Sequence, residues 1–441
     1  MIPVAWQRDL ISAMLESSDT LCVAPTGKGK SLPMFQVAQT DNPVVVVVPL
    51  VALADNLDLR ATQQGLQSYA WHGKLAGFEK TAVSGRIERG DYQIVFTTPE
   101  SLHAINLAKV SHVVVDEAHS IFSLATLRPE YLHMWRKLSS KEFRKCHRYA
   151  LHALSATLSL PERDRLALDM ACSISCPPYV DVADIARHDI EVSIQRIESK
   201  DMPDFVKSIP GRQLIFCQTT RRAEDLARAL ACPDVYHGKL TGDRRVNTIA
   251  RWHAGSCNRI VATNALGVGV DLSGVDAVLH DGPAKSLAEQ VQEIGRTGRW
   301  DQGGKSIVMM SGRDWIYPDR LFLDCHPSPE VLHKVWRYAK LDDIYHDQAT
   351  LCYATGENPD TVRMILTILE QLQCLSWESE SSGYMIRRCQ GIQWPDVMDR
   401  WRQRTVADTL SVRAHSRALR AKSSDEFWHV VNSWYRYARV V

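Results

Sequence analysis

The chain has 441 residues, of which 45% are hydrophobic and 23% charged, and its formal net charge is +1. This length and composition indicate about two to four globular domains and exclude a wholly disordered protein. There is no run of about 20 uncharged apolar residues and no basic region before an apolar run at the N-terminus, so we expect a cytoplasmic protein without a membrane span. The small net charge leaves a nucleic-acid partner open, because phosphate contacts need only a local basic track.

The first half of the chain alternates short β-branched runs with stretches of helical length. Residues 44–48 are five consecutive valines, which is typical of a strand buried on both faces of a parallel sheet. Residues 79–89 have helical periodicity, and the alternation as a whole is the βαβ pattern of a doubly wound sheet. We therefore predict strands at residues 20–24, 44–49, 94–97, 113–115 and 150–155.

A similar set of elements follows Cys176-Pro177-Pro178, where the first pattern breaks. Its predicted strands lie at residues 190–194, 213–217, 259–262, 277–280 and 305–309. From about Trp315 helical sequence takes over, and a predicted amphipathic helix at residues 360–373 precedes a hairpin at 375–378 and 384–387, which is the order of a winged helix. The predicted fold class is α/β, with two parallel-sheet lobes at residues 1–180 and 181–315 and a mainly helical accessory region at 316–441 that contains the winged-helix candidate.

The last stretch, residues 391–441, is basic and rich in aromatic residues. It holds nine Arg or Lys residues and five acidic ones, interleaved with tryptophan and tyrosine. Such a surface could bind a nucleic-acid strand, because arginine contacts phosphate and aromatic rings stack on bases. The alternative, which we favour, is a helical bundle with the aromatic residues in its core. The 11 cysteines are scattered and the close pair Cys172 and Cys176 has no second pair nearby, so we expect no zinc site.

The segment from Ala24 to Ser31, APTGKGKS, follows a predicted strand and precedes a predicted helix. It matches a phosphate-binding loop, with Ala24 in place of the first glycine. Glycines in such a loop let backbone N–H groups turn toward phosphate, the lysine neutralises the β- and γ-phosphates, and the serine hydroxyl holds Mg²⁺. The loop therefore predicts ATP and Mg²⁺ as cofactors, bound by Thr26, Gly27, Lys28, Gly29, Lys30 and Ser31.

A second motif, Val113-Val114-Val115-Asp116-Glu117-Ala118-His119, is an apolar strand that ends in two carboxylates. At such a position Asp116 can bind Mg²⁺ through water and Glu117 can polarise the attacking water. The alternative is a solvated turn, which we disfavour because a buried strand has little structural use for two adjacent acids.

A third motif lies far along the chain, in the second predicted lobe. Gln292 begins the segment QEIGRTGR, in which Arg296 and Arg299 are spaced to reach a γ-phosphate and stabilise charge in the transition state. Because these arginines come from the other lobe, hydrolysis would require the lobes to close, and closure can be coupled to movement along a polymer.

With these motifs in this order, the chain resembles a superfamily 2 helicase, and most closely the RecQ family. The resemblance covers residues 6–299 and implies two RecA-like lobes with ATP between them. It assigns motif Ia to residues 49–53, motif Ib to 97–100, motif IV to 213–219 with the helix 221–230, and motif V to 262–271. It implies that Gln7 and Asp271 contact nucleotide, that Pro49, Thr98, Pro99, Arg128 and Thr263 contact nucleic acid, and that His119, Ser155 and Thr157 couple hydrolysis to strand binding.

The chain also departs from the RecQ pattern. Residues 120–127 keep only Phe122 of an aromatic-rich loop that senses single-stranded DNA, and the four-cysteine zinc module is missing. We expect an ATP-dependent DNA helicase that moves 3′-to-5′ on single-stranded or forked DNA, in processes such as DNA repair or recombination. Two alternatives stay open: an RNA helicase with the same motor, and an ATP-gated binding switch that does not unwind.

Overall fold

The computed structural model describes residues 2–16, 19–40, 42–123, 128–158, 160–171, 179–181, 186–266, 272–298, 303–312, 314, 327–339, 344–379 and 382–437. The chain forms two compact units. The first unit comprises Met1–Ala118, Lys137–Pro318 and Ser411–Arg439, and the second comprises His119–Arg136, Asp319–Leu410 and Val440–Val441. The accessory region expected at residues 316–441 is thus divided, because its C-terminal helix belongs with the first unit.

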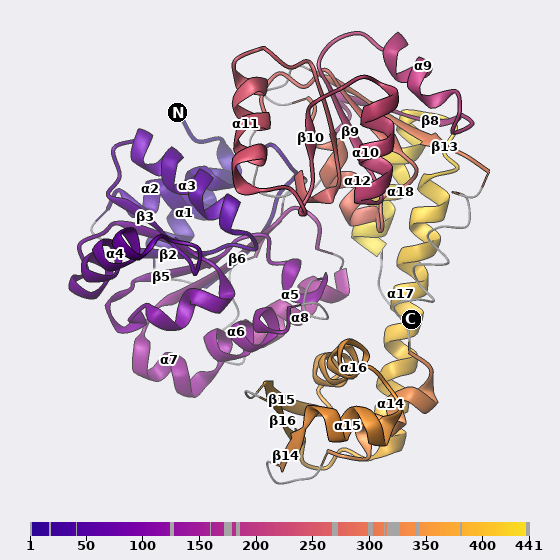
Figure 1. The fold of residues 1–441 in the computed structure, drawn as a ribbon. Coiled ribbons are helices and arrows are strands. Elements are labelled where there is room, and N and C mark those ends of the chain that lie inside the picture. The colour runs from indigo at the N-terminus through magenta and orange to yellow at the C-terminus, as the bar shows by residue number, and fades with distance from the viewer. Residues whose placement is uncertain are drawn as a thin grey trace. The chain divides into compact units, whose positions relative to one another are not determined.

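The first lobe is a seven-stranded parallel sheet with the order β3-β4-β2-β5-β6-β1-β7. Figure 1 labels β2, β3, β5 and β6 of this sheet. All four valines of the central strand β2 are buried, as a strand covered on both faces requires. The strands are β1 (Thr20–Val23), β2 (Val44–Val47), β3 (Ser68–Trp71), β4 (Ile94–Thr97), β5 (His112–Val115), β6 (Ala150–Ser155) and β7 (Tyr179–Asp181). The helices are α1 (Ala5–Leu15), α2 (Ser31–Ala38), α3 (Val51–Gln63), α4 (Gly77–Arg89), α7 (Lys141–His147) and α8 (Leu160–Ala171).

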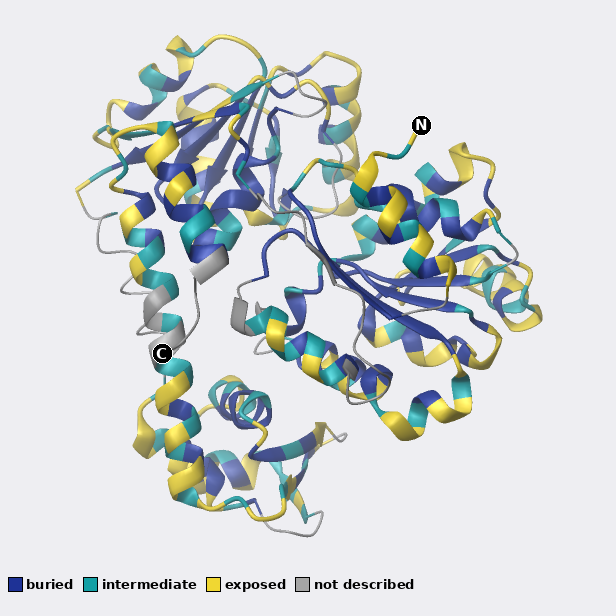
Figure 2. Ribbon diagram, turned by 180° about the vertical axis from the view of Figure 1, so that it is seen from behind, coloured by how far each residue is buried: buried dark blue, intermediate teal, exposed yellow. Residues whose placement is uncertain are grey.

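The second lobe is a six-stranded parallel sheet with the order β10-β11-β9-β12-β13-β8. Strand for strand this is the order β3-β4-β2-β5-β6-β1 of the first lobe, so the two lobes share one topology. Figure 2 shows most strands of the two sheets in dark blue, as buried. The strands are β8 (Ile190–Arg196), β9 (Gln213–Cys217), β10 (Val235–Tyr236), β11 (Arg259–Ala262), β12 (Ala277–Asp281) and β13 (Gly304–Met310), and the helices are α9 (Met202–Ser208), α10 (Thr220–Ala229), α11 (Gly242–His253) and α12 (Leu287–Ile294).

The α/β class and the two lobes are confirmed, and every strand predicted from the sequence is present with ends shifted by two residues or fewer. The sequence did not reveal β3, β7 or β10. All three lie at the edge of a sheet and have two to four residues, so neither a long apolar run nor a clear alternation marks them.

The second unit has the element order of a winged helix. Its elements are α14 (Pro329–Trp336), β14 (Ile344–Asp347), α15 (Gln348–Thr355), α16 (Pro359–Gln371), β15 (Leu375–Ser379) and β16 (Gly383–Arg388). The three strands form an antiparallel sheet in the order β14-β16-β15 over a core that includes Ile365, Leu369 and Trp377. The predicted amphipathic helix and hairpin are confirmed.

Two helices follow, α17 (Trp394–Ala418) and α18 (Ser424–Tyr437), and α18 packs on the edge strand β8. Trp428 Nε1 donates a hydrogen bond to the carbonyl oxygen of Ile190 (3.1 Å). Phe427, Trp428, Trp434 and Tyr435 are all buried. These aromatic side chains therefore form a core, and the interpretation of them as a base-stacking surface is wrong. Over the described ranges, the structure contains no helix with the length and apolar character needed to span a membrane.

Candidate functional site

The predicted phosphate loop lies between β1 and α2, and the buried side chain of Gln7 is hydrogen-bonded to its backbone. Gly27 and Gly29 adopt left-handed backbone angles, with φ of 75° and 80°. Gln7 Nε2 of α1 donates hydrogen bonds to the carbonyl oxygens of Lys28 (3.2 Å) and Gly29 (3.0 Å). A Cβ atom at Gly29 would lie 2.9 Å from that nitrogen, so both the turn and the close approach of Gln7 favour glycine there.

Polar groups at this loop are suited to an anionic ligand. Lys30 Nζ donates to the carbonyl oxygens of Ala24 (3.2 Å) and Pro25 (3.3 Å), both in its own loop. Thr26 Oγ1 is buried and has no hydrogen-bond partner among the described residues. With Ser31 at the first position of α2, the loop offers an ammonium group, two hydroxyls and a helix N-terminus, which fits a nucleotide phosphate with Mg²⁺.

Two carboxylates follow β5, where the sequence predicted them. Asp116 is buried, and Glu117 adopts a left-handed φ of 51°, which is uncommon for a residue with a side chain. The backbone N–H of Glu117 donates to Asp116 Oδ1 (2.9 Å). Burial, together with the charge of Glu117, raises the pKa of Asp116 to about 7, while the charges of Lys30 and Arg60 act in the opposite direction. A divalent cation would offset that cost of burying charge.

Motif VI of the second lobe lies directly on the phosphate loop of the first. A Cβ atom at Gly295, just after α12, would lie 1.8 Å from Thr26 Oγ1, so the backbone of Gly295 packs against that side chain. Arg296 follows; burial lowers the pKa of its guanidinium, and the charges of Glu117 and Glu293 oppose that shift. The structure thus brings Arg296 within electrostatic range of Glu117. Gln292 is a buried residue of α12.

Arg187 was missed by the sequence analysis because it lies outside every motif. Its Nη1 donates to the carbonyl oxygen of Thr26 (2.9 Å), and its Nη2 donates to that of Gly298 in motif VI. Asp189 orients the guanidinium through a hydrogen bond from Nε to Oδ1 (2.9 Å). One buried side chain therefore joins the phosphate loop to motif VI. Nothing in the sequence marks it, because its contacts with the phosphate loop and with motif VI are to backbone carbonyls.

The predicted coupling residues Ser155 and Thr157 lie behind the phosphate loop. The backbone N–H of Ala24 donates to the carbonyl oxygen of Ser155 (3.0 Å), because β1 and β6 are neighbours. The N–H of Thr157 donates to Ser155 Oγ (3.3 Å). His119, the third predicted coupling residue, and Arg128 belong to the second unit, where the Arg128 guanidinium lies 5.0 Å from the ring centre of Tyr131. Arg299 and Asp271 lie outside the described residues.

The predicted nucleic-acid residues lie at the carboxyl ends of matching strands. Pro49 follows β2, Thr98 and Pro99 follow β4, and Thr263 follows β11, the counterpart of β4 in the second lobe. All four are buried.

A repeated turn, also missed by the sequence analysis, lies beside these positions. Residues 72–77, HGKLAG, follow β3, and residues 237–242, HGKLTG, follow β10. In each turn the histidine is buried and faces a carboxylate: His72 Nε2 lies 2.8 Å from Asp55 Oδ1, and His237 Nε2 lies 3.2 Å from Glu224 Oε1. The near-identity of the two hexapeptides was the signal that could have revealed the common topology of the lobes.

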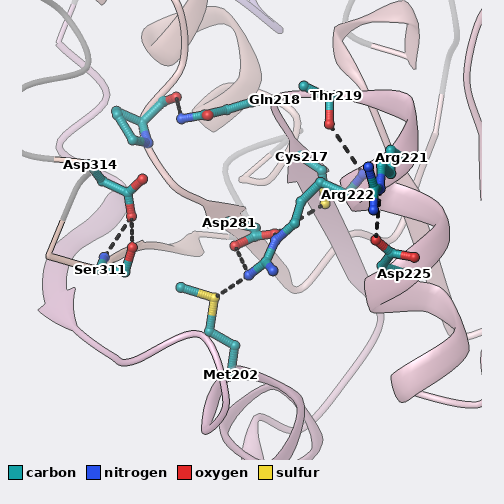
Figure 3. Close-up of polar contacts among 11 residues, drawn as sticks. Met202, Cys217, Gln218, Thr219, Arg221, Arg222, Asp225, Asp281, Ser311 and Asp314 are labelled. Carbon is teal, nitrogen blue, oxygen red and sulfur yellow. Dashed lines mark hydrogen bonds and ion pairs between the residues drawn. The ribbon is translucent and has the colours of Figure 1, made fainter.

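Polar contacts anchor motif IV to the sheet (Figure 3). Arg222 of α10 donates two hydrogen bonds to Asp281 at the end of β12, one of them from Nη2 to Oδ1 (2.9 Å). Cys217 Sγ at the end of β9 lies 3.7 Å from Asp281 Oδ2, and Thr219 Oγ1 caps α10 by accepting from the N–H of Arg222 (3.2 Å). Arg222 is therefore occupied inside the lobe, whereas Arg221 beside it is exposed.

Sequence profiles of two families match the chain in consecutive segments. The DEAD/DEAH box helicase profile matches residues 4–166, and the helicase conserved C-terminal domain profile matches residues 199–301. The two segments contain the loop, the carboxylates and motif VI described above, and together they cover more than half of the chain.

Similar proteins agree with these matches. The chain is 25% identical over 342 residues to the ATP-dependent DNA helicase RecQ of Pasteurella multocida (strain Pm70), covering 74% of this chain and 52% of that protein. It is 25% identical over 387 residues to the probable ATP-dependent DNA helicase RecS of Bacillus subtilis (strain 168), covering 83% of this chain and 76% of that protein. The chain thus spans about half the length of the RecQ relative.

The fold is similar to that of Mycobacterium smegmatis helicase Lhr, solved with ssDNA and AMP-PNP. The TM-score is 0.58 at 21% identity, covering 92% of this chain and 60% of that chain. The matched profiles, the relatives and the two lobes joined at one phosphate loop lead to a single assignment. The chain belongs to the superfamily 2 helicases and is RecQ-like.

Proposed function

We propose that the chain is an ATP-driven motor that moves 3′-to-5′ along single-stranded DNA and separates the strands of forked duplexes. The observation that carries this proposal is the meeting of motif VI with the phosphate loop, where Gly295 packs on Thr26 and Arg296 faces the charge of Glu117. A nucleotide in this loop would touch both lobes, so its hydrolysis would change how the lobes bind each other.

The chemistry follows from the residues around the loop. Bound ATP supplies the free energy of hydrolysis, and Mg²⁺ neutralises charge on its phosphates. In this proposal Lys30 binds the phosphates, Ser31 and Asp116 hold the metal ion, and Glu117 orients the attacking water. Thr26, Gly27, Lys28 and Gly29 surround the phosphates, and Gln292, Arg296 and Arg299 complete the site from the second lobe, with Asp271 near the nucleotide.

Gln7 has a more specific role in this proposal. Both of its amide N–H groups are used by the loop carbonyls, and its Oε1 accepts one hydrogen bond from the N–H of Val4 (2.9 Å). Oε1 therefore keeps a second lone pair, and we propose that it accepts a hydrogen bond from the adenine amino group. Loop shape and base recognition would then depend on one side chain.

The proposed track is a single strand that crosses the carboxyl ends of β2, β4, β9 and β11, where Pro49, Thr98, Pro99 and Thr263 lie. Arg128 of the second unit is proposed as a nucleic-acid contact of that unit. The contacts would be mainly to the sugar–phosphate backbone, so we expect little sequence specificity. DNA is proposed as the natural track because the sequence relatives are named as DNA helicases. We propose residues 1–180 and 181–315 as the two motor domains and 316–441 as the accessory region, whose last helix α18 belongs to the same compact unit as the motor domains.

The test measures ATP hydrolysis by the wild-type chain and by Lys30→Ala with single-stranded DNA, duplex DNA or RNA. We expect single-stranded DNA to stimulate the wild type most, and Lys30→Ala to lose at least about 100-fold in kcat, because a preorganised positive charge on the transferring phosphate would be lost. DNA-stimulated hydrolysis that survives in Lys30→Ala would overturn the proposal.

Strand displacement on a forked duplex by the chain alone separates the motor from its alternatives. Unwinding of DNA supports the proposal. Unwinding of RNA alone would identify an RNA helicase, and ATP-dependent strand binding without displacement would identify a switch.

A further inference from the structure

The segment immediately after the catalytic carboxylates belongs to the second unit, which contains the winged helix and is called the winged-helix unit. Ala118 ends the first piece of the first unit, which contains both lobes and is called the motor unit, and His119 begins the winged-helix unit. The segment contains α5 (Ser120–Ser123) and the first part of α6 (Glu130–Ser139), and α6 returns the chain to the motor unit at Lys137. Both ends of the segment are therefore covalently joined to the first lobe.

Within the winged-helix unit, α16 holds this segment through one buried acid. Arg136 Nη1 of α6 donates a hydrogen bond to Glu370 Oε1, and His133 Nε2 lies 3.2 Å from Glu370 Oε2. The Glu370 side chain is only 1% exposed. A buried carboxylate needs charged or hydrogen-bonding partners, and both of these partners come from α6. Trp377 adds an edge-to-face contact with the His133 ring at 5.3 Å.

Neighbouring contacts fix the same end of α16. Gln371 Nε2 donates to the carbonyl oxygen of Phe122 (3.3 Å), and Arg404 of α17 donates to Gln371 Oε1 (2.5 Å). Arg400 donates to the carbonyl oxygens of Leu372 (2.8 Å) and Gln373 (3.0 Å) and so caps the helix. These contacts therefore fix the C-terminal end of α16, the end that contacts α6.

The position of α16 in the winged helix makes this contact unusual. It is the second helix of the helix–turn–helix pair α15–α16, the element that in DNA-reading proteins enters the major groove. Here every residue from Ile365 to Glu370 is buried, so this part of the helix is used inside the protein.

We propose that Glu370 is a positioning residue that couples the winged-helix unit to ATP hydrolysis, by holding α6 and thereby the segment that leaves Glu117. The inference rests on the proposed function, because it concerns the rate of that hydrolysis. Movement of α16 would be passed through His133 and Arg136 to a segment that begins two residues after Glu117. Nucleic acid bound to the winged-helix unit would then change the hydrolysis rate.

The experiment compares Glu370→Gln, Arg136→Gln and the double variant with Glu378→Gln, a matched control because Glu378 is exposed on β15 of the same unit. For each protein, kcat and KM for ATP are measured with and without an oligo(dT) strand. We expect Glu370→Gln and Arg136→Gln to lower the stimulation by DNA roughly tenfold, which is a typical size for coupling between two sites. KM for ATP and the rate without DNA should stay within about twofold of the wild type, as should all values for Glu378→Gln.

The double variant guards against a trivial loss of folding. It buries no unpaired charge, so its thermal unfolding should match that of the wild type while its stimulation by DNA stays low. The losses of DNA stimulation in Glu370→Gln and in Arg136→Gln should not add in the double variant, because both substitutions remove the same contact. Normal stimulation in the double variant, or additive losses, would overturn the inference. A wild-type chain without DNA-stimulated hydrolysis would instead refute the proposed function, and that measurement precedes any comparison of variants.

Discussion

The charge on Asp116 is costly in the folded protein, because the carboxyl group is buried beside Glu117. Its pKa of about 7 lies well above the value of about 4 expected in an unfolded chain. The folded state therefore holds this proton more tightly, so this group lowers stability as the pH rises from about 4 to about 7. A carboxylate that destabilises the protein where it stands is typical of a ligand-binding position.

Replacing Asp116 with asparagine should therefore stabilise the protein at high pH. The amide keeps an oxygen for the N–H of Glu117 but carries no charge. Without nucleotide or metal, we expect Asp116→Asn to be more stable than the wild type by up to about 4 kcal/mol at pH 8, with the difference vanishing near pH 4. Thermal unfolding of both proteins across this range measures the effect. A less stable variant at pH 8 would show that the charge is compensated in the native state.

Single residues were predictable where their chemistry follows from chain order. Lys30 and Glu117 each follow a recognisable apolar strand, so type and position could be read together. Arg187 could not be predicted, since an arginine that binds the carbonyl oxygens of Thr26 and Gly298 requires only that those carbonyls be near in space. Glu370 was missed for a related reason: a buried acid cannot be recognised until its partners on α6 are known.

At the scale of elements, every strand in the interior of a large sheet was predictable, whereas among the edge strands only the longer ones, such as the seven-residue β8, were found and the short β3, β7 and β10 were missed. A strand such as β2 is buried on both faces, so its sequence is apolar throughout, whereas β10 has two residues and one neighbouring strand. The C-terminal helix α18 was ambiguous for a different reason. Aromatic residues among arginines suit either a core or a nucleic-acid surface, and only the packing on β8 decides between them.

The packing of α18 predicts a large effect of one substitution. Trp428 is fully buried, and its indole N–H binds the carbonyl oxygen of Ile190. Trp428→Ala should lower the free energy of unfolding by about 3–5 kcal/mol through the cavity and the lost hydrogen bond. Phe78→Ala is the matched control, because Phe78 is 88% exposed in the same unit, and its effect should stay within about 0.5 kcal/mol. Equal effects in denaturant unfolding would mean that α18 contributes little to the fold.

For the whole molecule, the central feature is that the phosphate loop of the first lobe is in contact with the second lobe. The motif order predicts two lobes around a nucleotide, but the residues that form contacts between the lobes could be identified only from the structure. Arg187 and Gly295 approach Thr26 from the second lobe, and neither could be assigned that contact from sequence spacing.

Arg187→Gln should uncouple the lobes without removing a group assigned to the chemistry. We expect kcat/KM for ATP to fall about tenfold or more, because the phosphate loop and motif VI would lose their shared support. Binding of single-stranded DNA in the absence of ATP should be unchanged. Arg196→Gln at the end of β8, the strand that follows Arg187, is the control, since that side chain is 73% exposed. Full ATP turnover by Arg187→Gln would indicate that this bridge has no part in catalysis.

The position of α18 also matters for anyone who shortens the chain. Strand β8 has seven residues and one hydrogen-bonded neighbour, β13, and α18 packs beside it. A version trimmed at the end of the second lobe to isolate the motor would leave the backbone groups along that edge without this cover. Uncovered edges recruit strands from other molecules. Such a fragment is expected to self-associate during purification, and this self-association would say nothing about its ability to hydrolyse ATP.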